Sequence, residues 1–268
     1  MWPEMRVQLR GQVRSQELTP AARARAARQL LNVYAGLASR EEHLLRGLLA
    51  NGPPAQWERL PRDDAVDRAG MFQWFYHCHA PEDRPGTAEH GHFHLFAKRA
   101  LWEPRAGEPD EIEFAKLAGA APEDSGTRHL FGVSLDPKGV PSSLFAVDSS
   151  ATGDAMMSVG GTLRALRAMK LDTGFPEIDR VLESVVALCD EDLRELLERR
   201  DEALRASGPG AGAEPGSDVL SETPIDLDRR LEAALRPTRP TRRPRQEDPR
   251  RPRPARARAE TSAGPRGR

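Results

Sequence analysis

Histidine is concentrated in one short part of this 268-residue chain. Five of the seven histidines lie between residues 71 and 98, at His77, His79, His90, His92 and His94. Neutral imidazole is the commonest metal ligand among protein side chains, and zinc sites often combine several imidazoles. Side chains two residues apart share one face of a β-strand. The spacing of these histidines therefore predicts a polar cluster on paired strands and makes the cluster a candidate metal site.

The two groups of histidines are expected on neighbouring strands. Residues 72–79 are rich in aromatic side chains, and residues 90–98 alternate histidine with other residues, so each stretch is typical of a strand. Residues 80–89 contain two prolines and a glycine and are expected to form a loop. A strand, a loop and a strand of these lengths most simply form an antiparallel hairpin.

The register of this hairpin decides whether the histidines meet. The sequence leaves this register open: if His79 pairs with His90, then His77 faces His92 and Phe75 faces His94. Directly opposed residues have Cβ atoms ~4.5–5.5 Å apart, which lets two imidazoles share one cation. A slip of one residue would turn one group to the other face and separate the cluster.

The candidate ligands of zinc or iron are His77, His79, His90 and His92, with His94 as an alternate. Three imidazoles leave a fourth position for water, as in a catalytic site, whereas four close the site. Glu89 is a candidate carboxylate ligand, and a carboxylate with two histidines would favour non-haem Fe(II). His129 and Asp154 are further candidates from the sequence that follows.

The same pattern has an interpretation without metal. The histidines can be polar members of a half-exposed sheet, hydrogen-bonded to one another or to carboxylates. The chain would then be a non-enzymatic binding or scaffold domain whose histidine face contacts an anionic ligand or a protein partner. The two interpretations differ in geometry, because a metal site needs at least three imidazole nitrogens within ~2.0–2.2 Å of one point.

Established catalytic motifs give little support to other enzyme classes. A cupin would need a glutamate soon after its histidine pair, but the first acidic residue after His94 is Glu103. The sequence contains no HExxH, GxSxG, Walker or Rossmann glycine motif. The substrate, if the protein has one, is an unknown small molecule or protein.

The surrounding sequence predicts an α+β fold. Thr19 and Pro20 are typical of a helix start, and an apolar stripe from Ile178 onward predicts a long amphipathic helix. Residues 128–135 and 143–147 are expected to add two strands. We therefore predict an antiparallel sheet of about four strands flanked by N- and C-terminal helices. Residues 55–70 are expected to form a polar loop anchored by a buried Trp57.

Composition divides the chain into a body and a basic tail. Residues 236–268 carry 12 arginines against three acidic residues, a net charge of +9, so the remainder carries −10. We expect a mobile lead-in (1–17), a single α+β domain (18–206), a flexible linker (207–225) and an Arg/Pro-rich disordered tail (226–268). Such a tail can make weak, non-specific contact with nucleic acid through phosphate groups.

Cysteine content and hydropathy indicate the cellular compartment in which the protein is expected. The chain has two cysteines, which excludes a disulfide framework, and lacks an apolar run long enough to span a membrane. We therefore expect a cytoplasmic protein with no membrane contact.

Several stretches together resemble a known family. They are YHCHAPEDRP, EHGHFHLF, RHLFGVSLDPKG and GFPEIDRVLESV, within about residues 20–205. They resemble an uncharacterised bacterial family known only as a domain of unknown function. The resemblance implies an α+β cytosolic domain and carries over no activity.

Overall fold

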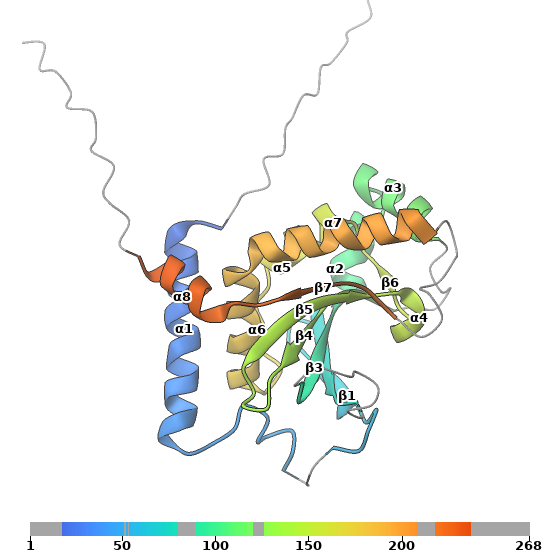
Figure 1. Cartoon of the computed structure of the whole chain (residues 1–268). Helices are drawn as coiled ribbons and strands as arrows, with labels where there is room; N and C mark the ends of the chain where they lie inside the picture. The colour runs from blue at the N-terminus through green and yellow to red at the C-terminus, as the bar shows by residue number, and fades with distance from the viewer. Residues whose placement is uncertain are drawn as a thin grey trace, which may run out of the picture. The chain divides into compact units, whose positions relative to one another are not determined.

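The computed structural model describes residues 18–50, 52, 54–79, 89–119, 126–207 and 218–236. In this part of the chain a sheet packs against helices (Figure 1). The helices are α1 (Pro20–Ser39), α2 (Arg99–Trp102), α3 (Pro109–Ala118), α4 (Ser149–Thr152), α5 (Val159–Arg167), α6 (Pro176–Leu188), α7 (Asp190–Ser207) and α8 (Leu227–Leu235), with a 3-10 turn η1 (Glu103–Arg105). The strands are β1 (Leu60–Val66), β2 (Phe72–His77), β3 (Gly91–Lys98), β4 (Thr127–Leu135), β5 (Pro141–Val147), β6 (Ala155–Met156) and β7 (Val219–Pro224).

The strands form one sheet in the order β1-β2-β3-β4-β5-β7, with antiparallel neighbours, and β6 pairs with β4 in parallel. The predicted α+β class and the antiparallel hairpin are confirmed. The predicted number of four strands is wrong, because the sheet has seven strands within the described residues.

The three additional strands carry weak strand signals in the sequence. β1 contains a proline and two aspartates, which are depleted in strands, and its pairing with β2 is interrupted by a bulge. β6 is only two residues long. β7 lies at the sheet edge within residues 207–225, where a linker was expected, and α8 lies at the start of the expected tail. The lead-in (1–17) and residues 237–268 fall outside the described residues.

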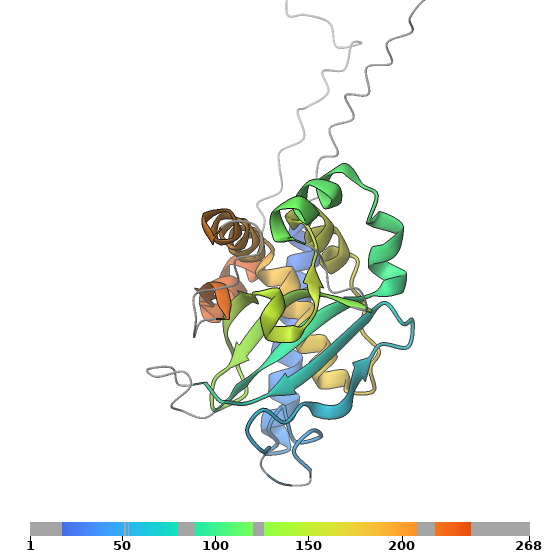
Figure 2. The same cartoon turned by 90° about the vertical axis from the view of Figure 1, so that its right-hand side faces the viewer.

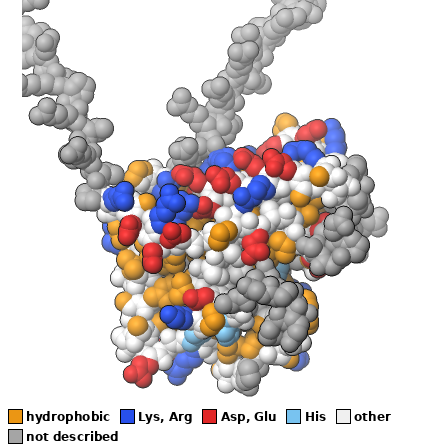
Figure 3. All heavy atoms as spheres, viewed as in Figure 1, with side chains coloured by type: hydrophobic (Ala, Val, Ile, Leu, Met, Phe, Trp, Pro, Cys, Tyr) orange, Lys and Arg blue, Asp and Glu red, His pale blue; other side chains and the backbone are white. Residues whose placement is uncertain are grey.

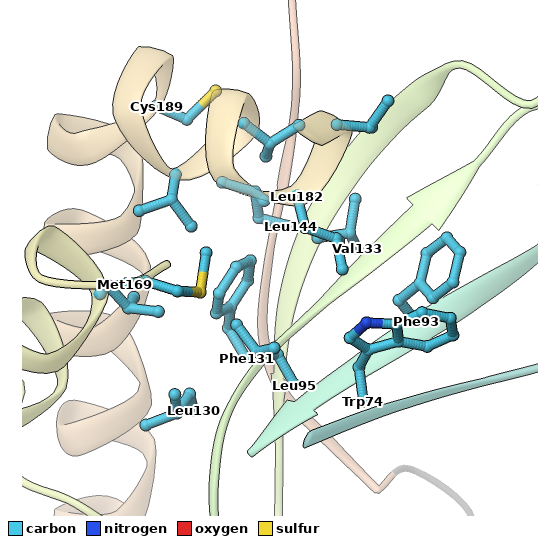
Figure 4. Packing of buried hydrophobic residues seen from close by; sticks show 14 of the residues in the cluster. Trp74, Phe93, Leu95, Leu130, Phe131, Val133, Leu144, Met169, Leu182 and Cys189 are labelled. Atoms are coloured by element: carbon cyan, nitrogen blue, oxygen red, sulfur yellow. The ribbon is translucent and has the colours of Figure 1, made fainter. Parts of the chain in front are cut away.

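One face of the sheet forms the main hydrophobic core with the helices. Trp74, Phe93, Leu95, Val133 and Leu144 project from the strands onto α5, α6 and α7, where they meet residues such as Leu182 and Met169 (Figure 4). The Trp74 indole N–H also donates to Asp179 Oδ1 on α6 at 3.2 Å. The apolar stripe predicted from Ile178 onward is thus part of the core.

The helix α7 illustrates why these helices need the sheet. Leu193, Leu196 and Leu197 are fully buried, whereas the outer side of the helix is densely charged. Acidic and basic side chains are interspersed along the edge of the molecule where α7 lies (Figure 3). An amphipathic helix of this kind is stabilised mainly by packing of its apolar stripe.

The opposite face of the sheet faces away from α1 and α6, which lie behind the sheet in Figure 2. Strand alternation gives this face its own buried aromatic residues, Phe75, Phe96 and Phe145, outside the main core. The histidines of β2 and β3 project from this second face, which we call the histidine face.

Candidate metal centre

The strands of the hairpin pair in the register that brings the histidines together. His77 pairs with His92, and Phe75 pairs with His94. The third pair of that register, His79 and His90, lies beyond the ladder, because β2 ends at His77 and β3 begins at Gly91.

Three of the predicted ligands converge. His77, His79 and His92 each offer a ring nitrogen, and these three atoms lie within 4.8 Å of one another. The ring centroids of the three imidazoles are separated by 4.4 to 4.9 Å. Two nitrogens bound to one tetrahedral zinc are roughly 3.3 Å apart, given Zn–N bonds of ~2.0–2.1 Å. The three rings are therefore arranged closely enough to hold a single ion after small side-chain rotations.

His94 lies directly beside this triad. Its Nε2 is 3.2 Å from Nε2 of His77, and Nε2 of His77 is 2.5 Å from Nε2 of His92. The His94 ring also stacks on Phe75, with ring centroids 5.0 Å apart. His94 is thus placed to act either as a neighbour of the triad or as a fourth ligand, in keeping with its predicted alternate role.

Glu89 contacts the outer nitrogen of a candidate ligand. The Nδ1–H of His92 donates to Oε1 of Glu89, which leaves Nε2 of His92 with its lone pair toward His77. Carboxylates in this position fix the tautomer and orientation of metal-binding histidines. The structure therefore places Glu89 beside a candidate ligand, whereas the sequence analysis gave Glu89 as a candidate ligand itself.

His129 joins the cluster from the neighbouring strand β4. Its Nε2 is 3.0 Å from Nδ1 of His94, and only 2 % of the residue is exposed. A bulge in β4 causes this placement: Leu95 pairs with Phe131 and the next residue, Phe96, pairs with His129. Without the extra residue, His129 would share the core face of Phe131. The sequence named His129 as a candidate but gave no signal for the bulge.

His90 lies outside the cluster. The Tyr76 hydroxyl lies 2.6 Å from Nδ1 of His90 and donates to its carbonyl oxygen at 3.1 Å, and Tyr76 belongs to the core face. The His90 ring packs near His43, with centroids 5.4 Å apart. The alternation of side chains between the two faces of the sheet does not extend past Gly91 to His90. A Cβ at Gly91 would stand 2.2 Å from the Tyr76 hydroxyl. His90 is consequently not placed to share an ion with the other predicted ligands.

Asp154 is also separate from the triad. Its carboxylate accepts a hydrogen bond from the hydroxyl of Thr127, at the opposite end of β4 from the residues that pair with His92. Burial raises the pKa of the Asp154 carboxyl, an effect partly offset by the hydrogen bond from Thr127. The structure gives Asp154 no contact with the three converging imidazoles.

Burial keeps three imidazoles of the cluster, those of His77, His94 and His129, neutral. Desolvation, together with the neighbouring histidines His92 and His79, lowers the pKa of His77 to about 3. Desolvation lowers the pKa of His129 to about 3 as well, and it lowers the pKa of His94 well below its usual value. A neutral imidazole keeps the lone pair that a metal needs, so these groups do not have to lose a proton at neutral pH in order to bind one.

Two residues that the sequence analysis did not assign to the site flank the triad. Trp57 was predicted to be buried, and this is wrong: 57 % of it is exposed, and its ring centroid is 4.0 Å from that of His79. Arg59 places its guanidinium 3.9 Å from the centre of the Phe75 ring. Neither has a sequence signal, because both precede β1 and reach the site only through its pairing with β2.

A family model described as Domain of unknown function (DUF6969) matches residues 24–227. The chain belongs to this family. The match extends through β7, in agreement with the pairing of that strand with β5. No curated protein and no solved structure matches the chain. Among the described residues of this DUF6969 member, no helix combines the length and apolar character needed to cross a membrane.

Proposed function

We propose that this protein is a mononuclear metal-dependent enzyme whose ion, zinc in the first instance, is held by His77, His79 and His92. The observation that carries the proposal is the convergence of three ring nitrogens from two neighbouring strands within 4.8 Å. Three neutral imidazoles with an open fourth position are the ligand set of catalytic zinc.

The surroundings of the triad support zinc over iron. Non-haem Fe(II) sites usually combine two histidines with a carboxylate that binds the ion directly. Here the carboxylate of Glu89 is engaged with Nδ1 of His92, on the far side of that ring from His77. This leaves an all-imidazole set, with Glu89 supporting one ligand by a charge-assisted hydrogen bond.

The chemistry would be hydrolysis or hydration. A bound zinc lowers the pKa of a coordinated water to near 7 and acts as a Lewis acid. The chain's own contribution is to fix two of the three imidazoles, through strand pairing for His77 and His92 and through Glu89 for the tautomer of His92. Phe75 and Phe145 line the same face and exclude water from its interior.

A second function is favoured by a specific observation. His94 and His129 are hydrogen-bonded to each other, so part of the cluster satisfies its polar atoms without an ion. If the triad behaves in the same way, the domain is a non-enzymatic binding module whose histidine face contacts an anionic ligand or a protein partner. Metal content separates the two functions.

The test is elemental analysis of the purified full-length chain, before and after incubation with zinc. We expect about one equivalent of zinc for the wild type and a large loss for His79→Ala, a half-buried residue whose truncation leaves the ladder of β2 and β3 intact. His90→Ala is the matched control, because His90 is in the same stretch but points away from the triad. Absence of zinc from the reconstituted wild type, or equal loss in both variants, would refute the proposal.

A further inference from the structure

The segment before β1 follows the rim of the histidine face on two sides of His77. Trp57 lies against His79, with centroids 4.0 Å apart, and its ring is 5.9 Å from that of His77. Arg59 lies over Phe75, whose ring centroid is 5.4 Å from that of His77. One short stretch of chain thus places an indole near His77 and a guanidinium on the Phe75 ring that neighbours His77.

The backbone at Trp57 adopts an unfavourable conformation. Its φ is +66°, in the left-handed region that bulky residues rarely adopt. Its backbone N–H donates to the carbonyl oxygen of Cys78, the residue between His77 and His79, at 3.0 Å. Strained backbone of this kind is found preferentially at ligand-binding sites. Here it keeps an indole that is 57 % exposed next to the converging nitrogens.

The Phe75 ring and the Asp64 carboxylate together position the guanidinium of Arg59. Its guanidinium stacks on Phe75, and its Nη2 donates to Oδ2 of Asp64 at 2.7 Å. Asp64 is itself held by Gln73, whose Nε2 donates to the same oxygen at 3.0 Å. The Arg59 side chain is 49 % exposed, so these contacts do not bury it completely. A planar guanidinium in a fixed orientation is well suited to recognise a carboxylate.

We propose that Trp57 and Arg59 form the substrate-recognition wall of the candidate metal centre, and that the substrate class is a small planar carboxylate with an aromatic ring. This inference rests on the proposed function, since the reacting group would be directed toward the ion. The ring of the substrate packs on the exposed face of Trp57, and its carboxylate pairs with Arg59. Aromatic stacking and a charge-assisted hydrogen bond supply the two recognition contacts.

The test uses the zinc-loaded full chain with benzoate as the probe and titration calorimetry as the readout. We expect Trp57→Gly, which suits the left-handed backbone, and Arg59→Gln each to weaken benzoate binding about tenfold or more. Arg68→Gln is the matched control, because Arg68 pairs with Asp172 in a solvent-exposed ion pair. Benzyl alcohol, which lacks the charge, should bind weakly to the wild type and show no dependence on Arg59.

Zinc content, measured on every sample, distinguishes failure of the proposed metal site from failure of the recognition wall. Zinc bound at one equivalent in all variants, with benzoate weakened only by the Trp57 and Arg59 substitutions, supports the recognition wall. Zinc retained, but benzoate binding absent from the wild type or insensitive to both substitutions, overturns the recognition wall alone. A wild type that binds no zinc overturns the proposed function and this inference with it.

Discussion

Acid should unfold the metal-free protein through its buried histidines. The pKa values of His77 and His129 are lowered to about 3, and that of His94 is lowered well below the usual value, in each case chiefly by burial. Below pH 6.5 the unfolded chain therefore binds protons that the folded chain does not. The linkage relation then requires stability to be complete above pH 6.5 and to fall as the pH is lowered toward the folded pKa values.

The size of the effect follows from the number of groups. Each imidazole that is protonated only in the unfolded state removes about 1.4 kcal/mol of stability per pH unit. Three such groups remove roughly 4 kcal/mol per pH unit, against a typical total of roughly 5–15 kcal/mol. The midpoint of acid unfolding should therefore fall roughly 1 to 4 pH units below 6.5, between about pH 5.5 and 3.

The assay is urea unfolding at half-unit steps from pH 7 to pH 5 in the presence of EDTA. His129→Asn, which removes one titrating group, should reduce the pH slope by about a third if the variant folds. A wild-type slope corresponding to less than one proton, about 1.4 kcal/mol per pH unit, would refute the reasoning that burial keeps these imidazoles neutral.

Three further perturbations test separate parts of the structure. Zinc at 1,000 times its dissociation constant should raise the unfolding free energy of the wild type by about 4 kcal/mol, measured by urea unfolding. The same zinc concentration should raise the unfolding free energy of His79→Ala much less. Gly132→Ala should lower the unfolding free energy by roughly 1–3 kcal/mol, because the new Cβ would stand 2.1 Å from the Phe145 ring. Leu182→Ala, in the fully buried core, should cost about 2–5 kcal/mol by the same assay, whereas Ile112→Ala at an exposed position should change little.

The part of the site that was predictable depends on strand periodicity alone. Histidines two residues apart must share a face, and the hydrophobic pattern of the hairpin allows only registers that keep Trp74 and Phe93 in the core. That is why a register with the pairs His77–His92 and Phe75–His94 could be named from the sequence, although the sequence did not select it among the registers of the same parity. Periodicity holds only within a ladder, and His90 lies just outside the ladder.

What the sequence did not reveal comes from irregular backbone and from distant pairing. The bulge in β4 turns His129 toward His94, although neighbouring residues give no hint of an extra residue there. The left-handed backbone at Trp57 and the pairing of β1 with β2 bring residues to the site from a stretch that looked like a polar loop. β7 was missed for a similar reason: an edge strand with few apolar residues gains its order from β5.

The two faces of the sheet differ in the side chains that they bury. The core face is covered by helices and contains the large apolar side chains that supply most of the favourable burial energy. The histidine face also buries His94 and His129, whose lowered pKa values reduce stability at acid pH and keep their imidazole lone pairs available. A fold that needed this face only for stability would be better served by apolar residues of similar size. Under the proposed function, the polar cluster, the Glu89 carboxylate beside His92 and the strained backbone at Trp57 serve to bind an ion and a ligand.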